Sequence, residues 1–450
     1  MSKQRIQLSD HFTYPRLLRF VLPCIGTMLF TSIYGIVDGL CVSNFVGKTA
    51  FAAVNLIMPL PMLLGTIGFM LGTGGSAIVG ITLGEGDQKK ADRYFTLFLL
   101  AALVSVSVLA VLGIVFLRPI AVLLGAKGEL LDYAVRYGRI LMVSLPTFAL
   151  QNMFQSFFVT AEKPHLGFWF TVGAGCTNMV LDVLMVGVWG WGVEGAAIAT
   201  FISQLVGGVL PVFYFIDRSN SSRLHLCKTS FYSKVLRDAC INGSSELMTN
   251  LSMSLVNILY NYQLLRFAGE DGVAAYGVIM YASFLFVAVF VGYAVGSAPI
   301  VSYHYGANNR KEVNNLYRKS LKLIGVVAVG MTIGSMFIIP HVARFFVGYD
   351  ENLLILTTRA FRLYGLSFLI MGFNVYASSF FTALGDGVTS ALISFLRTLL
   401  FQVAAVLLLP LLLGIDGIWL AVTAAELAAL LVSIGLFITR DQQFHYRKAE

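Results

Sequence analysis

The sequence predicts an all-α, polytopic membrane protein with twelve transmembrane helices in two six-helix bundles. Three observations lead to this fold class. The 450 residues are 57% hydrophobic and only 12% charged, with a mean hydropathy of +0.80. The apolar residues gather in runs long enough to cross a hydrocarbon layer of about 30 Å as helices. The pattern of the first half also returns in the second half, which indicates an internal repeat.

Apolar runs between charged markers define the twelve predicted helices. They leave no polar block large enough for a soluble domain, so the composition excludes a soluble enzyme of two or three domains. The predicted spans are residues 18–43, 51–82, 94–117, 136–160, 166–189, 195–216, 240–265, 273–304, 316–340, 354–383, 388–413 and 416–439.

A shift of 222 residues superposes the two halves without a gap. The matched pairs include Gly47 with Gly269, Asn152 with Asn374, Thr160 with Thr382, Gly192 with Gly414, and Gly195 with Gly417. Because each repeat holds an even number of helices, the halves run in the same direction and are related by a pseudo-two-fold axis along the membrane normal. We expect an N-terminal bundle at 1–216, a basic cytoplasmic linker at 217–238 and a C-terminal bundle at 239–450.

Such a pair of bundles is typical of transporters that hold substrate between the halves and rock between two openings. A duplicated scaffold around a static pore is the alternative. Gly68, Gly72, Gly74, Gly292 and Gly296 lie inside apolar spans, where they predict close helix packing rather than a phosphate-binding loop. No GxxxxGK[ST] motif occurs, which argues against a built-in ATPase motor.

The net charge of +8 reflects basic residues in short loops, so it predicts topology and a lipid bilayer as partner rather than nucleic acid. The loops richest in Lys and Arg place both termini in the cytoplasm, with the chain in the cell membrane. The first residues resemble a cytoplasmic tail and not a removable signal. The five cysteines have no metal-ligand spacing, and we expect no disulfide framework, no metal site and no cofactor.

The segment from Asn178 to Thr200 carries the most informative polar residues. Asp182 is the only charged side chain between His165 and Glu194, and a charge within a span costs about 2.5–3.5 kcal/mol. Asn178 lies four residues before Asp182 and therefore on the same helix face. Thr200 returns on the next, antiparallel helix to a similar depth.

Asp38 lies at the depth of Asp182, because each follows a marker at the inner end of its span, Arg19 or His165, by 17 to 19 residues. Two neighbouring carboxylates in a poorly hydrated pocket cannot both ionise cheaply, so the site suits a shared proton, or Na⁺ if both ionise around it. Tyr34, one turn before Asp38, is expected to hydrogen-bond to it. The alternative is a purely structural set of polar contacts between helices.

The repeat mates of Asp38 and Asp182 are Tyr260 and Ala404, so this chemistry belongs to one half only. The second half instead carries Glu246, Arg397 and Glu426 inside its spans. Either Arg397 and Glu426 form an internal ion pair, or one of them faces a cavity and contacts substrate.

Asn152 and Asn374 occupy matching mid-span positions in the two halves. With Arg397 they are the candidate lining of a substrate cavity. Structural packing of the two amides is the alternative.

Several motifs together resemble the multidrug and toxic compound extrusion (MATE) family of cation-coupled exporters. They are Asp38 ahead of NFVGKTAFAAVN at 44–55, GEGDQKK at 84–90, and GVEGAAIAT at 192–200, within two six-helix halves. The resemblance covers essentially the whole chain. In one branch of the family it implies a cation site whose members correspond to Asp38, Asn178, Asp182 and Thr200. Pro23 matches the proline at which the first helix of that branch is proposed to bend.

The resemblance implies a secondary antiporter, and not an enzyme, that exports amphipathic, often cationic compounds in exchange for H⁺ or Na⁺ by alternating access. It would act as a monomer. A second branch of the family uses acids in the seventh and tenth helices, a pattern from which this chain departs. A lipid-linked saccharide flippase of the same superfamily is the alternative function. An integral membrane transferase would need clustered acidic metal ligands such as DDxxD, which do not occur.

Overall fold

The computed structural model describes residues 6–46, 48–348 and 350–446, and these residues form helices and no strand. Within them, nine helices are long and apolar enough to cross a membrane, and the bent pair α12 and α13 makes a tenth if counted as one span. The all-α, polytopic prediction is therefore confirmed. The count of twelve stays a prediction, because the 63-residue helix α10 counts once and α5 is not among these nine helices.

The helices of the first half follow the predicted spans closely. They are α1 (Tyr14–Phe45), α2 (Lys48–Ile57), α3 (Pro59–Gly84), α4 (Gln88–Leu123), α5 (Gly128–Thr160), α6 (Pro164–Asp182), the π-helix η1 (Val183–Val188), α7 (Gly192–Gln204), the π-helix η2 (Leu205–Val209) and α8 (Leu210–Ile216).

The second half begins after an irregular segment at 217–232. Its helices are α9 (Ser233–Asn242), α10 (Ser244–Gly306), α11 (Arg310–Val347), α12 (Glu351–Gly365), α13 (Phe368–Ala383), α14 (Gly387–Phe395), the π-helix η3 (Leu396–Leu400), α15 (Phe401–Leu413), α16 (Ile415–Thr439) and α17 (Asp441–Phe444).

The long helix α10 is two crossings joined at Gly269. A straight helix of 63 residues would measure about 95 Å, roughly three times the hydrocarbon thickness. Gly269 has φ 59° and ψ −148°, a conformation that residues with a Cβ rarely adopt, and the chain turns back there. Gly192 and Gly414, which the repeat matches, also share a positive φ, of 60° and 58°.

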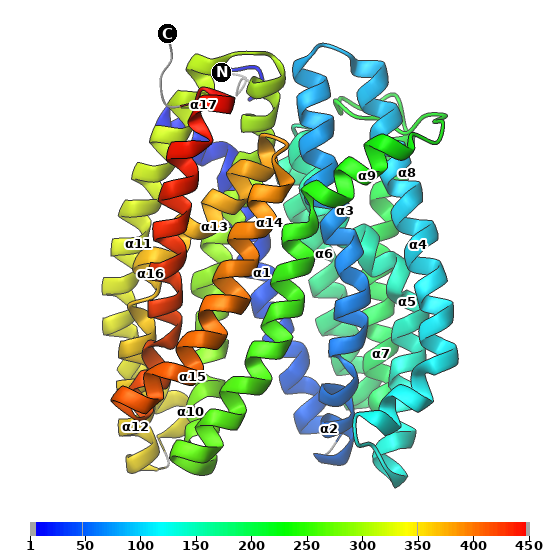
Figure 1. Ribbon diagram of the computed structural model, residues 1–450. Coiled ribbons are helices and arrows are strands. Elements are labelled where there is room, and N and C mark those ends of the chain that lie inside the picture. The colour runs from blue at the N-terminus through cyan, green and yellow to red at the C-terminus, as the bar shows by residue number, and fades with distance from the viewer. Residues whose placement is uncertain (1–5, 47, 349, 447–450) are drawn as a thin grey trace.

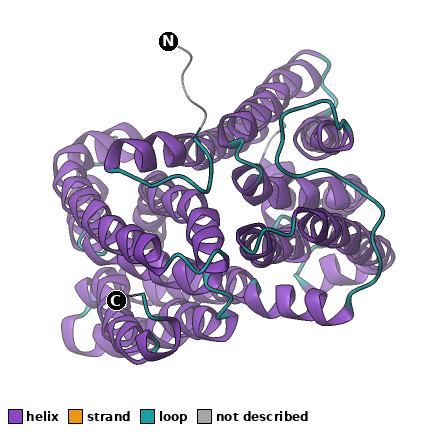
Figure 2. Cartoon of the chain, turned by 90° about the horizontal axis from the view of Figure 1, so that it is seen from above, coloured by secondary structure: helices purple, strands orange, loops and turns teal. Residues whose placement is uncertain are grey.

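The helices form two groups that stand side by side, α3 to α8 in one and α11 to α16 in the other (Figure 1). The first and last described residues lie at the same end of the molecule, here called the terminal end. From that end, the loops are seen to run over both groups (Figure 2).

At the terminal end, helix α3 of the first half touches helix α10 of the second half backbone to backbone through glycines. A Cβ on Gly84 would lie 2.0 Å from the carbonyl oxygen of Tyr303, and one on Gly306 would lie 2.0 Å from that of Ile81. Farther along α3, a Cβ on Gly74 would lie 2.2 Å from the carbonyl oxygen of Ala239. Small residues permit this approach, so the expected role of the in-span glycines in close packing is confirmed.

A short N-terminal segment, residues 6–13, ties the two groups together at the terminal end; we call it the strap. The Leu8 amide donates to Glu162 Oε1 at 3.0 Å, and the Phe12 amide donates to Glu312 Oε1 at 2.9 Å. Glu162 follows α5 in the first half, whereas Glu312 begins α11 in the second. Leu8 and Phe12 are fully buried, so the strap is part of the core at this end.

Candidate functional site

The first cluster of buried polar residues lies where α1, α5, α6 and α7 meet, toward the end opposite the termini. Asp182 is fully buried and Asn178 is 2% exposed. The Asn178 amide lies 3.5 Å from the Thr200 hydroxyl oxygen, at the limit of a hydrogen bond. The structure thus brings residues of α6 and α7 to one depth, as the antiparallel turn between them requires.

Asp38 of α1 completes this cluster. Its carboxyl group interacts electrostatically with that of Asp182. Within the described part of the chain, Asp38 Oδ1 and both carboxylate oxygens of Asp182 are buried without a hydrogen-bond partner. Neither acid forms an ion pair with a described basic residue. A buried polar atom without a partner costs about 1–3 kcal/mol, so a proton or a cation between these groups would be strongly favoured.

The local backbone at Asp182 changes from α-helix to π-helix. Helix α6 ends at Asp182, and η1 begins at Val183. A π turn inserts an extra residue into the helical register, and such turns occur frequently at functional sites. No residue pattern in the sequence indicated it.

Two tyrosines flank the carboxyl pair. Tyr34 interacts electrostatically with Asp38, and Tyr137 of α5 does so with both acids. The expected hydrogen bond from Tyr34 to Asp38 stays a prediction. Tyr137 was not among the predicted residues, because the repeat and the spacing of charges give no signal for a tyrosine at the start of a span. Its side chain is 1% exposed.

Pro23 lies within α1, and the helix continues through it to Phe45. Proline removes one backbone donor from a helix. The Thr27 hydroxyl donates to the Pro23 carbonyl oxygen at 2.9 Å, an additional bond in this turn. Pro23 lies about four turns from Asp38 and does not contact the carboxyl pair.

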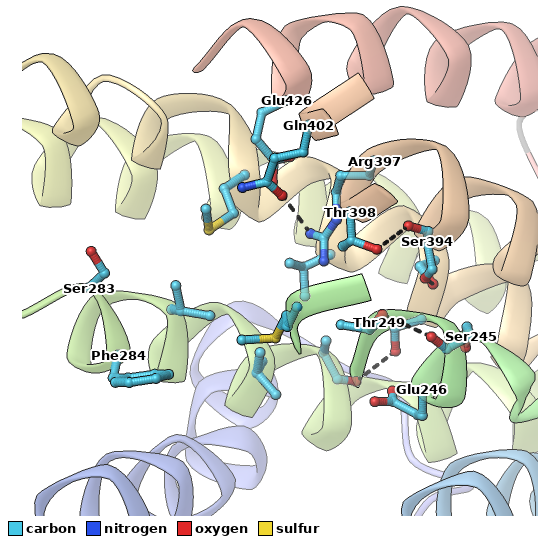
Figure 3. A pocket seen from close by; sticks show the side chains of 18 of the residues that line it. Ser245, Glu246, Thr249, Ser283, Phe284, Ser394, Arg397, Thr398, Gln402 and Glu426 are labelled. Atoms are coloured by element: carbon cyan, nitrogen blue, oxygen red, sulfur yellow. Dashed lines mark hydrogen bonds and ion pairs between the residues drawn. The ribbon is translucent and has the colours of Figure 1, made fainter. Parts of the chain in front are cut away.

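A separate cavity of about 280 Å³ lies mainly within the second half (Figure 3). Its walls come from α10, α12 to α16 and η3, and the first half contributes Thr73, Ser76 and Ser156. Aromatic and methionine side chains form part of the surface. They are Tyr276, Phe284, Tyr364, Met253, Met280 and Met371. A mostly apolar wall with a few polar groups is typical of a site for small molecules.

Three ionisable side chains line this cavity: Glu246, Arg397 and Glu426. Arg397 Nη1 and Glu426 Oε1 form an ion pair at 3.8 Å, and the two side chains are 14% and 7% exposed. The expected ion pair is therefore present, and the paired residues also line the cavity. Contact of either residue with substrate stays a prediction. Glu246, on α10, forms no ion pair with a described residue.

Asn374 and Asn152 do not line the cavity. Asn374 is fully buried behind it, where its amide donates to the Glu426 backbone oxygen at 2.8 Å and to Glu426 Oε2 at 2.7 Å. The Ser433 hydroxyl donates to Asn374 Oδ1 at 3.0 Å. Asn374 therefore orients Glu426. Asn152 is buried, and its Nδ2 has no hydrogen-bond partner among the described residues.

The described residues contain no group of three or more His, Cys, Asp or Glu side chains that could hold a metal ion. Asp38 and Asp182 belong to the first half, and none of the four predicted cation-site residues lines the cavity. The structure thus separates the carboxyl pair from the cavity, each in its own half.

The MatE family model matches this chain twice, at residues 23–184 and again at residues 247–407. The two matches fall in the two halves. Among curated proteins, the chain is 21% identical to the multidrug export protein MepA of Staphylococcus aureus strain MSSA476, over 95% of this chain and 94% of that protein. The MepA protein of Staphylococcus saprophyticus is equally similar, at 21% over 427 residues, with the same coverage.

Solved structures share the fold over nearly the whole chain. An outward-facing multidrug resistance MATE family transporter of the MOP superfamily superposes with a TM-score of 0.92 at 22% identity, covering 99% of each chain. A MOP superfamily transporter from Pyrococcus furiosus, described as having a binding pocket of reverse polarity, superposes with a TM-score of 0.90 at 22% identity and the same coverage.

Proposed function

The chain belongs to the MatE family, and we propose that it is a multi-pass cell-membrane antiporter that exports small amphipathic compounds in exchange for a cation. The family and the MepA relatives support export of small molecules. The carboxyl pair Asp38 and Asp182 supports coupling to a cation. No cofactor is needed for this exchange.

The observation that carries the coupling is the burial of two interacting carboxyl groups without a basic partner among the described residues. Asn178 and Thr200 add an amide and a hydroxyl group to the same cluster. A proton shared between the acids relieves their repulsion directly. Na⁺ would need further oxygen ligands in a suitable arrangement. We therefore favour H⁺ as the coupling ion, with Na⁺ as the alternative.

The driving force is sufficient for export without ATP. One proton that enters down about 150 mV and one pH unit supplies about 3.5 and 1.4 kcal/mol, respectively. The sum sustains a gradient of a few thousandfold for an uncharged compound. Exchange of one proton for one monovalent cation moves no net charge, so only the pH term acts, and it sustains a gradient of about tenfold. A proton bound at Asp38 and Asp182 would be released on the opposite side of the membrane from the exported compound.

Alternating access is proposed to open and close the terminal end. The glycine contacts between α3 and α10 and the strap hold the two helix groups together there. Both termini lie in the cytoplasm by the positive-inside rule, so this closed end would be the cytoplasmic one. A monomer suffices for this motion, because both groups belong to one chain.

The polarity of the cavity disfavours a lipid-linked saccharide flippase. Such a substrate carries phosphate groups and calls for a cluster of cationic side chains. Among the residues that line the cavity, Arg397 is the one basic side chain and two are glutamates. An amphipathic cation fits this charge balance better.

Reconstitution in liposomes tests the coupling. With an imposed pH gradient and no sodium, the purified protein is expected to accumulate a cationic dye against its gradient, and Asp38→Asn and Asp182→Asn are expected to abolish this accumulation. Transport that requires a sodium gradient at constant pH would replace H⁺ with Na⁺ as the coupling ion. Wild-type accumulation by both variants would refute the coupling site itself.

A further inference from the structure

The cavity of the second half holds one cationic side chain, Arg397, and two glutamates in a wall of apolar, aromatic and hydroxyl-bearing side chains. Arg397 reaches it from η3, where the helix changes from α to π geometry. Figure 3 shows its guanidinium group directed into the cavity, between Glu426 on one side and the segment from Ser245 to Thr249 on the other. A cation in this position needs a reason, because placing it there is costly.

The guanidinium group makes no hydrogen bond within the described part of the chain. Its Nε and Nη1 atoms are buried without an acceptor. The nearest carboxylate contact, to Glu426, is 3.8 Å long and so is an ion pair without a hydrogen bond. The charge of Arg397 is therefore balanced, while Nε and Nη1 have no acceptor among the described residues.

A chain of hydrogen bonds behind the cavity fixes the partner of Arg397. Ser433 donates to Asn374, and Asn374 donates to both the backbone and the carboxylate of Glu426. One Glu426 oxygen is thus held by Asn374, while the other faces Arg397. This arrangement prevents Glu426 from turning to satisfy the guanidinium donors, so Asn374 and Ser433 act as positioning residues.

The charges that face the cavity set the class of ligand. Arg397 and Glu426 cancel, and Glu246 adds one negative charge when ionised. A ligand with one positive charge balances that carboxylate. A carboxylate on the ligand that bound Arg397 would lie beside the Glu426 carboxylate, and the two negative charges would repel each other. A neutral carbonyl oxygen can accept a hydrogen bond from Arg397 without this repulsion.

We propose that Arg397 is a specificity-determining residue that receives a carbonyl oxygen of the exported compound, and that the cavity selects aromatic monocations bearing such an acceptor. The inference rests on the proposed export function and names its substrate class. Glu246 faces the cationic group, and Tyr276, Phe284 and Tyr364 supply the surfaces for the aromatic rings.

A matched pair of dyes tests the proposal on detergent-purified protein. The first dye is a rhodamine methyl ester, a cation with a carbonyl acceptor. The second is its tolyl analogue, in which a methyl group replaces the ester. Fluorescence anisotropy measures the affinity of each dye for the wild type and for the double variant Arg397→Gln/Glu426→Gln, which removes both charges of the ion pair and leaves Glu246 in place for the cationic group.

We expect the double variant to weaken binding of the ester about tenfold or more, the usual range for a lost hydrogen bond to a charged group, and to change binding of the tolyl dye less than twofold. Arg397→Lys, which keeps the charge but not the planar donors, should lose part of the same preference. Equal effects on the two dyes, or none on either, would overturn the assignment of Arg397.

The positioning residues have their own readout. Ser433→Ala should lower the ratio of ester to tolyl affinity in the same direction by a smaller factor, while Ser254→Ala, an exposed serine on α10, should leave that ratio unchanged. If Ser433→Ala lowers the affinity for both dyes by the same factor, Ser433 does not act as a positioning residue. Protein that shows the dye preference but fails to pump either dye in liposomes would refute the export function and leave the Arg397 site standing.

Discussion

The two halves of the molecule share a backbone plan but treat buried charge in opposite ways. In the first half, Asp38 and Asp182 face each other without a basic partner among the described residues. In the second half, Glu426 faces Arg397. The repeat places Tyr260 and Ala404 where the first half has its acids. The carboxyl pair of one half is thus open to a proton or cation, whereas the pair of the other half is already neutral.

The first half in turn lacks the ion pair of the second half. The 222-residue shift matches Arg397 with Gly175 and Glu426 with Gln204. A Cβ at Gly175 would lie 2.5 Å from the Phe30 ring and 3.1 Å from the Tyr34 ring, so a side chain there would have to displace these rings. The position that carries a cation in one half is filled by neighbouring rings in the other. The two halves therefore share a scaffold, and substitutions at matched positions give one half an acid pair and the other an ion pair beside a cavity.

The largest expected effect on transport comes from replacing Asp182, an acid without a basic partner among the described residues. Asp182→Asn should reduce coupled export to background, because the amide cannot exchange a proton or hold a cation as a carboxylate does. Folding should be unharmed, since a lone buried charge is removed. Glu194→Gln, at an acid that is 47% exposed, is the matched control and should transport normally. Export in everted vesicles is the measurement. Coupled export that persists in Asp182→Asn would show that the acid pair of the first half does not couple transport to a cation.

Replacing one member of the Arg397–Glu426 ion pair should lower the stability of the protein, whereas Asp182→Asn should not. Glu426→Gln leaves Arg397 buried without its counter-charge, which costs about 3–5 kcal/mol. We expect a clear drop in the melting temperature of purified protein, in contrast to Asp182→Asn.

The double variant Arg397→Met/Glu426→Leu is the control for this second prediction. It removes both charges and should recover most of the lost stability, because well-packed apolar residues often replace a buried ion pair without loss. If Glu426→Gln and Asp182→Asn melt alike, the proposed difference between the halves is wrong.

The close approach at Gly175 gives a smaller effect that sharpens the comparison. Gly175→Ala should destabilise the protein by about 1–3 kcal/mol and disturb Tyr34, because the new methyl group overlaps the Phe30 ring. Gly173→Ala on the same helix meets only Val206, at 3.8 Å, and should be tolerated. Thermal melting of the two variants decides this, and equal melting temperatures would show that the helices can separate at Gly175 without cost.

The smallest effect concerns the hydrogen bonds behind the cavity. Ser433→Ala removes one donor to Asn374 and should cost about 1 kcal/mol, the usual net value of a buried hydrogen bond. The exposed Ser254→Ala should change stability by less than about 0.5 kcal/mol. A melting temperature of Ser433→Ala equal to that of Ser254→Ala would mean that Asn374 finds another donor.

The sequence predicted the helical spans well because hydrophobic length and flanking charge decide where a chain crosses a membrane. It did not predict the break between α12 and α13, where the helices bend by 45° at Leu366 and Ser367. The three π-helical segments were missed as well. A shift of the hydrogen-bond register by one residue depends on packing and has no fixed residue signature.

The candidate site residues were also predicted only in part, because their hydrogen-bond partners depend on packing. Spacing and depth brought Asp38, Asn178, Asp182 and Thr200 into one expected cluster, and the structure places them together. The repeat suggested equal roles for Asn152 and Asn374, yet Asn374 bonds to Glu426 while the mate of Glu426 is Gln204. Periodicity places a residue on a helix, but the partners available to it decide whether it turns toward a cavity or away.

The strap has a consequence for how the protein is made. Its residues are synthesised before their partners, because the partner of Leu8 lies 154 positions later in the chain and that of Phe12 lies 300 positions later. At about 5–20 residues per second, the second partner leaves the ribosome roughly 15–60 seconds after the strap. Two fully buried side chains must wait, unpaired, until most of the chain has been inserted. The terminal end is therefore among the last parts of the protein to assemble, and a chain arrested before α11 would present its strap to chaperones or proteases.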